Sequence, residues 1–408
     1  MADVSLRPSA IARHWASQAS ALRASGAALS ISLLATLVAG AVLAGARDTL
    51  TDTPGLLVLI PAAIGMRGSN FGALAARLGT GTLTGEFDGS LAPGSFLWRQ
   101  AEASIRLAVG GAASAGGIAW IAARTLGIET IPLLELVAIS LVGAVVAASA
   151  LLLVTVALAV RAHSANWSMD DVGAPIITAV GDVVSLPALL LATTLVSPGT
   201  TATVIGLSAF VLGALAVGTG AWSRSDLVRR VIRESAPVLA IAVSVDTVAG
   251  IVMEARLDSL LEEPALLVLI PPFVASSGAL GGMLASRLAS LLHVGMLAPR
   301  PIPSPDAWLQ MSMTGLLASI TFGAVGAVGW VAAVLGGLDP PSLLGLGTTS
   351  LVGGVLATVA LSGVAYLAAT ASYRFGLDPD NHSIPIVTAS MDLLGILCLV
   401  AAVGLTGG

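Results

Sequence analysis

Three aspartates lie inside long apolar stretches of the sequence, namely Asp182, Asp246 and Asp392. A carboxylate at the centre of a membrane-spanning helix costs at least about 2.5 kcal/mol on insertion scales, so such a residue is by default a functional candidate. Asp182 and Asp392 stand in two copies of one motif, and Thr178 and Thr388 precede them by four residues. Because residues four apart share a helix face, each copy presents a carboxylate and a hydroxyl in one direction.

Facing carboxylates with hydroxyls one turn away form an oxygen-only site of negative charge, which suits a hard cation such as Mg²⁺ or Ca²⁺. Magnesium is commonly held by one or two carboxylates through retained water. Softer metals recruit imidazole or thiolate. The four histidines, His14, His163, His293 and His382, lie in loops or at segment ends, and the single cysteine, Cys398, lies in an apolar run. The sequence therefore predicts no zinc or copper site, and we expect no organic cofactor.

The composition places these acids in a membrane protein. The chain of 408 residues is 56% hydrophobic and 10% charged, with a mean hydropathy of +0.96, which is far from the usage of soluble proteins. A hydrocarbon core about 30 Å thick takes about 20 helical residues to cross. Eleven segments are predicted to do so: 27–46, 54–76, 103–123, 131–160, 174–196, 202–222, 236–254, 264–286, 311–335, 343–370 and 384–406. We expect an all-α polytopic membrane protein whose net charge of −5 gives no indication of a nucleic-acid partner.

The sequence repeats itself at a constant offset of 210 residues (264 − 54). Residues 54–61 (PGLLVLIP) recur as 264–271 (PALLVLIP), and the register then matches Trp98 to Trp308, Trp120 to Trp330 and 175–182 to 385–392. Chance similarity between apolar helices would not repeat rare residues at one offset. We predict a short cytoplasmic or interfacial segment (1–26), a first five-helix unit (27–196), a linking helix with a basic cytoplasmic loop (197–235) and a second five-helix unit (236–408).

Six spans separate equivalent points of the two units, so the units should be parallel and related by a pseudo-twofold axis along the membrane normal. Asp182 and Asp392 can then face one another across the axis, and one chain would act as a pseudo-dimeric monomer. Arginine placement predicts the orientation in the cell membrane. With a cytoplasmic N-terminus and an outside C-terminus, thirteen arginines are cytoplasmic (7, 13, 23, 77, 99, 161, 224, 229, 230, 233, 287, 300 and 374) and three are outside (47, 124 and 256).

The second apolar segment of each unit is a further candidate because helix-breaking residues interrupt it. These are Pro61, Gly65, Gly68, Ser69 and Asn70 in the first unit and Pro271, Pro272, Ser276, Ser277 and Gly278 in the second. A break frees backbone carbonyls, which a membrane tolerates only where protein or a water-lined cavity satisfies them. Such carbonyls could complete a cation's shell. We therefore add Gly68, Asn70, Ser277 and Gly278 to the candidate ligands; the alternative is close helix packing through small residues.

The two halves are not identical, so we do not expect them to contribute equally. Asn70 is replaced by Leu280 in the second unit, which predicts that Asp182, with Asn70 behind it, matters more than Asp392. Asp246 has Thr36 as its counterpart. Since only one half has this acid, Asp246 is a candidate coupling-ion site, and the alternative is a locally satisfied polar group.

At these residues the sequence resembles the MgtE-type divalent cation transporters, and more closely their solute-carrier relatives in which the five-helix membrane unit is duplicated in one chain. The resemblance covers most of residues 27–406. It rests on residues 61–78, with a proline, a Gly-x-Asn and an Arg-Leu pair, and on 170–182 and 378–392, each ending in an aspartate. In that family the units pair around a central pore and the acid of the fifth helix binds magnesium. The resemblance implies Mg²⁺ as the transported ion and a site between Asp182 and Asp392.

Our first hypothesis is therefore a divalent cation transporter or channel, with the bilayer and the transported cation as its partners, and not an enzyme. An intramembrane aspartyl protease is the contrasting hypothesis, because two membrane aspartates occur together with Pro187-Ala188-Leu189. Those enzymes need an acid and a base in different environments, whereas here both acids sit in copies of one motif. A carrier of another solute is the third alternative.

Overall fold

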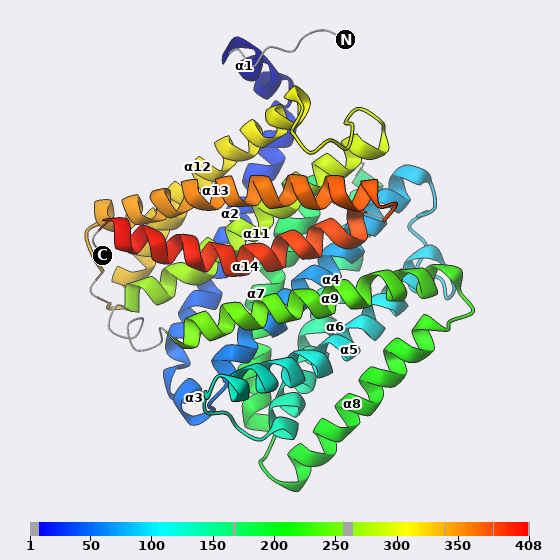
Figure 1. The fold of residues 1–408 in the computed structure, drawn as a ribbon, viewed down its shortest axis with the longest axis vertical. Helices are drawn as coiled ribbons and strands as arrows, with labels where there is room; N and C mark the ends of the chain where they lie inside the picture. The colour runs from blue at the N-terminus through cyan, green and yellow to red at the C-terminus, as the bar shows by residue number, and fades with distance from the viewer. Residues whose placement is uncertain (1–7, 166–168, 256–263, 339, 378, 407–408) are drawn as a thin grey trace.

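The computed structural model describes residues 8–165, 169–255, 264–338, 340–377 and 379–406, and every regular element in them is an α-helix (Figure 1). The helices are α1 (Pro8–Ser17), α2 (Ala19–Gly45), α3 (Arg47–Asp52), α4 (Leu56–Thr84), α5 (Phe96–Thr125), α6 (Leu133–Ala165), α7 (Met169–Leu195), α8 (Thr200–Ala221), α9 (Asp226–Glu254), α11 (Pro264–His293), α12 (Pro305–Leu335), α13 (Leu343–Arg374) and α14 (Pro379–Thr406).

Ten of the described helices are long and apolar enough to cross a membrane: α2, α4, α5, α6, α8, α9, α11, α12, α13 and α14. The remaining predicted span, 174–196, corresponds to α7, whose stretch Ala179–Leu195 is a shorter apolar helix within the described residues. The prediction of an all-α polytopic membrane protein is thus confirmed.

The two units exchange their first helices. Helix α2 packs against α7 of its own unit and α11 of the other, and the equivalent helix α9 packs against α14 of its own unit and α4 of the other. Further contacts join α4 to α14 and α7 to α11. Because each contact has a counterpart at the 210-residue offset, the units are related by an approximate twofold. Their shared interface is built from α2, α4, α7, α9, α11 and α14.

Serines and a glycine set several helix starts. The Ser95 hydroxyl accepts a hydrogen bond from the backbone N–H of Trp98 at the start of α5, and Ser304 does the same for Ala307 at the start of α12. Such caps satisfy N–H groups that have no partner within the helix. Gly55 precedes α4 with φ of +86°, and a Cβ there would lie 2.8 Å from Thr130 Cγ2. This position therefore requires glycine.

The second helix of each unit is continuous, so the predicted interruption of these segments is wrong. Helix α4 runs through Pro61, and α11 runs through Pro271 and Pro272. Each proline removes one N–H from the helix, and neighbouring helices in a packed bundle can accommodate that loss. None of the glycines in these two helices has a positive φ. Gly65, Gly81 and Gly281 allow close approach of neighbouring side chains, whereas a Cβ at Gly68 or Gly72 would meet nothing within 4 Å.

Candidate cation site between the two units

A cavity of about 120 Å³ lies where the two units meet, which is room for several water molecules. Its lining is mostly made of pairs that are equivalent at the 210-residue offset: Leu43 and Met253, Ile60 and Ile270, Pro61 and Pro271, Ile64 and Val274, Gly65 and Ala275, Gly68 and Gly278, Asp182 and Asp392, and Leu186 and Ile396. The cavity therefore lies across the pseudo-twofold.

Asp182 of α7 and Asp392 of α14 both line this cavity, and they are near enough for their charges to interact. Among the residues that the structure describes, no arginine or histidine belongs to the lining. Among the described residues, no group of three or more His, Cys, Asp or Glu side chains is arranged to hold a metal ion. Two carboxylates with water completing the shell are one common way in which proteins hold a divalent cation such as Mg²⁺.

Asp246 of α9 brings a third carboxyl group to Asp392. It is fully buried, and neither of its oxygens accepts a hydrogen bond from a described residue. The carboxyl group of Asp392 lies beside it, since both carboxyl groups border Gly65, and the two could share a hydrogen bond only if one of them carried a proton. The sequence could not place these two acids side by side, because their contact depends on the packing of α9 on α14.

Gly65 of α4 lies directly against this carboxyl pair. A Cβ at this position would collide with Asp246 Oδ2, and would lie 2.8 Å from Asp246 Cγ and 2.9 Å from Asp392 Oδ2. Real Cβ atoms essentially never approach other atoms so closely. The absence of a side chain at Gly65 therefore makes room for the third acid.

Hydroxyl groups join the two units beside Asp392. The Thr388 hydroxyl donates to the Ile384 carbonyl at 3.0 Å, so the Ser69 hydroxyl is the donor in the 2.9 Å hydrogen bond between Ser69 Oγ and Thr388 Oγ1. Both residues line the cavity. The side chain of Thr178, the counterpart of Thr388, lies outside the described residues.

The remaining predicted ligands are placed differently. Gly68 and Gly278 line the cavity, but within continuous helices. The Ser277 hydroxyl donates to the Phe273 carbonyl of its own helix at 2.9 Å. Asn70 does not line the cavity; its Nδ2 donates to the Ser104 carbonyl of α5 at 2.8 Å. The structure therefore does not bring Asn70 behind Asp182, because this residue lies on the face of α4 that packs against α5.

Arg67 was not predicted to matter, although it is the most unusual side chain of α4. It is fully buried, and none of its guanidinium nitrogens has a hydrogen-bond partner among the described residues. It is not part of the cavity lining. The signal in the sequence was an arginine in the middle of an apolar segment, beside Gly68.

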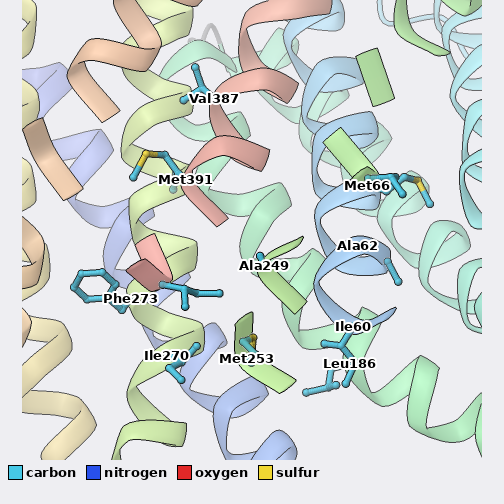
Figure 2. Close-up of a cluster of buried hydrophobic side chains, with 14 of the residues drawn as sticks. Ile60, Ala62, Met66, Leu186, Ala249, Met253, Ile270, Phe273, Val387 and Met391 are labelled. Carbon is cyan, nitrogen blue, oxygen red and sulfur yellow. The ribbon is translucent and has the colours of Figure 1, made fainter. Parts of the chain in front are cut away.

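Apolar side chains line part of the cavity. Figure 2 shows Ile60, Leu186, Met253 and Ile270 together at one level of the bundle. Leu186 follows Asp182 by four residues and Ile396 follows Asp392 by four, so this apolar ring lies one helical turn from the acids. Apolar constrictions of this kind can gate ion flow by dewetting.

A family model described as MgtE, divalent cation transporter, matches residues 60–192 and again 270–402. The matches are separated by 210 residues (270 − 60), as the internal repeat is, and together they cover more than half of the chain.

The chain belongs to the MgtE divalent cation transporter family. Its function class is therefore transport of divalent cations across a membrane, and the predicted resemblance is confirmed. MgtE proteins are transporters and not enzymes, so the protease hypothesis gains no support from the match. The matched residues include Asp182 and Asp392 but not Asp246, which lies between the two matches. No solved structure matches the chain.

Proposed function

We propose that the chain transports Mg²⁺ through the cavity between its two units, with Asp182 and Asp392 holding the ion. The observation that carries this proposal is the convergence of two equivalent carboxylates on a cavity whose described lining residues include no basic side chain. In a site of low dielectric, uncompensated carboxylates strongly favour a cation. Family membership supports a divalent one.

The lining favours a partly hydrated ion. The hydroxyls of Ser69 and Thr388 offer neutral oxygens beside Asp392. A Cβ on Gly68 would meet no atom within 4 Å, so the two cavity-lining glycines, Gly68 and Gly278, leave space for bound water. Magnesium gives up its waters reluctantly and needs such space.

We assign Asp246 to a coupling ion, Na⁺ or H⁺. This carboxyl group lies behind Asp392, is buried without a donor among the described residues, and has only a threonine at the equivalent position of the first unit. A small monovalent cation between Asp246 and Asp392 would satisfy both acids. The divalent ion and the coupling ion would then compete for the carboxylate of Asp392.

The test is flux of Mg²⁺, Ca²⁺ and Mn²⁺ into proteoliposomes that contain the purified chain, with and without a Na⁺ or proton gradient. We expect Mg²⁺ to be carried, and one of the two gradients to change its rate. Divalent flux equal to that of empty liposomes would overturn the proposal. Flux of Mn²⁺ or Ca²⁺ that excludes Mg²⁺ would overturn the choice of ion.

We propose a cytoplasmic N-terminus and an outside C-terminus for the protein in the cell membrane. The test uses a Cys398→Ala background with a cysteine introduced at Glu86, between α4 and α5, or at Glu129, between α5 and α6; both positions are exposed. An impermeant thiol reagent added to intact cells should label the variant at Glu129 and spare the variant at Glu86. The reverse pattern would contradict this orientation.

A further inference from the structure

Two equivalent grooves occur where the first helix of one unit meets the other unit, and a described helix fills only one of them. The first groove lies between α5 of the first unit and α9 of the second, where Leu107, Gly110 and Leu239 line it and Val217 of α8 closes it. The second groove, of about 210 Å³, lies between α12 of the second unit and α2 of the first, and is lined at the equivalent positions by Leu317, Ile320 and Leu29. Figure 1 shows α8 beside α5 along one edge of the bundle.

The first groove is built to receive a helix. Gly110 allows close approach, since a Cβ there would lie 2.5 Å from Val217 Cγ2. The Arg106 Nη1 group donates to Thr219 Oγ1 of α8 at 2.7 Å. At the end of α8, Arg233 Nε donates to the Ala221 carbonyl at 2.9 Å, and the Arg233 guanidinium stacks over the Trp222 ring at 5.4 Å. Close packing and polar contacts therefore both hold α8 in place.

The second groove has lost the features that hold a helix but has kept the arginine at its end. Arg106 is replaced by Leu316, and Gly110 by Ile320, whose side chain is 64% exposed. An isoleucine at this point would hold a helix away. The counterpart of Arg233 is Arg23, which lines the groove and is exposed. The walls of this groove are thus mostly apolar, and the guanidinium of Arg23 lies at its end.

We infer that the groove between α2 and α12 binds an anionic phospholipid, with an acyl chain along the apolar walls and the phosphate at Arg23. A flexible acyl chain conforms to a wall with a projecting isoleucine, whereas a rigid helix does not. A guanidinium matches phosphate oxygens with two parallel hydrogen bonds. Basic residues near the membrane surface are attracted to anionic lipid. The arginine that caps the α8 terminus at the first groove thus has a counterpart that binds a lipid headgroup at the second.

The bound lipid would act on the wall of the cation cavity. Helix α2 carries groove residues such as Leu29 and Leu33, and further along the same helix Ala39 and Leu43 line the cavity. A lipid that supports α2 from outside therefore stabilises the position of that wall. The site itself does not depend on which ion is transported.

The experiment is native mass spectrometry of the purified full chain with phosphatidylglycerol or phosphatidylcholine. Two variants alter the groove: Ile320→Trp fills it, and Arg23→Gln removes its charge. Two controls match them: Ile31→Trp, at an exposed position of α2 outside the groove lining, and Arg230→Gln, at an exposed arginine of α9. Ser30→Phe is a second filling variant, used if Ile320→Trp does not fold, because Ser30 is exposed and lines the groove.

We expect the wild type to retain phosphatidylglycerol in preference to phosphatidylcholine. Filling the groove should weaken retention of both lipids at least tenfold, Arg23→Gln should remove the preference, and the two controls should behave as wild type. Equal phosphatidylglycerol retention by all variants would overturn the inference. So would a wild type without lipid preference, or a filling variant that dissociates a second copy of the chain, since the occupant would then be protein.

Discussion

Replacing Gly65 with alanine adds one methyl group and no charge, yet it should disturb two of the three buried acids. The added Cβ would collide with Asp246 and lie 2.9 Å from Asp392 Oδ2. Helix α4 packs on both α9 and α14, so the added methyl group must displace one or both of these carboxyl groups. We expect the carboxyl pair to separate and the cavity wall at Asp392 to shift.

The magnitude follows from the cost of overpacking, about 1–3 kcal/mol for an inserted methylene group. Alanine regains about 0.5–1 kcal/mol of that cost through its better helix propensity. That gain acts on the ion-bound and the ion-free protein alike, so if the whole overpacking cost falls on the ion-bound arrangement, the affinity for Mg²⁺ should weaken roughly 5- to 150-fold, at about 1.4 kcal/mol for each factor of ten.

The assay is calorimetric titration of the purified variant with Mg²⁺, combined with thermal unfolding. The matched control is Gly72→Ala, at a glycine of the same helix outside the cavity lining, where a Cβ would meet nothing within 4 Å. This control should keep wild-type affinity. The double variant Gly65→Ala with Asp246→Thr places at these two positions the residues that occupy their repeat equivalents, Ala275 and Thr36. It should recover the stability that Gly65→Ala loses. Wild-type affinity in Gly65→Ala would refute the reasoning.

Three further predictions follow from single contacts. Thr388→Val removes the 2.9 Å hydrogen bond between the Ser69 and Thr388 hydroxyls. It should weaken the binding free energy of Mg²⁺, measured by titration, by about 0.5–1.5 kcal/mol, which is less than the loss of a carboxylate would cost. An unchanged affinity would mean that this hydroxyl pair is irrelevant to binding. Leu186→Asn places a polar side chain in the apolar ring, which should admit water and raise the leak of Mg²⁺ into proteoliposomes. An unaltered leak rate would exclude the ring as a constriction. Arg67→Met removes a buried charge without a described partner and should raise the free energy of unfolding by about 1–4 kcal/mol; a destabilised variant would show that the guanidinium is satisfied in the folded protein.

Much of the fold could be predicted from the sequence because its signals are local or repeated. Apolar length predicted the membrane helices, and rare residues at one offset, such as Trp98 and Trp308, predicted the two units. The continuity of α4 and α11 could not be predicted. A proline in an isolated helix signals a break, but the packing that lets a bundle tolerate Pro61 is a tertiary property.

The candidate site was predictable only where the repeat pointed to it. Asp182 and Asp392 were found as equivalent acids, but the closeness of Asp246 to Asp392 arises from the packing of α9 on α14 within the second unit, which no sequence pattern indicates. The sequence does contain one signal of this contact. Gly65 stands where the second unit has Ala275, and Asp246 stands where the first unit has Thr36. The two departures from symmetry belong together, because the added acid occupies the space of a missing Cβ.

The same geometry changes the expected ranking of the two central acids. Sequence reasoning placed Asn70 behind Asp182 and made Asp182 the more important acid. In the structure Asn70 bonds to α5, whereas Asp392 has Asp246, Gly65 and Thr388 around it. We now expect Asp392 to be the more sensitive position.

The most direct test of the account is Mg²⁺ uptake into proteoliposomes by Asp182→Asn and Asp392→Asn. Asparagine keeps the shape and one oxygen and removes only the charge, whose interaction with a divalent ion is large at low dielectric. The control is Asp226→Asn, because Asp226 is largely exposed and pairs with Arg229 outside the cavity. The account predicts that uptake falls at least tenfold in both cavity variants, further in Asp392→Asn, and is unchanged in the control. Uptake at the wild-type rate and affinity by both cavity variants would contradict it.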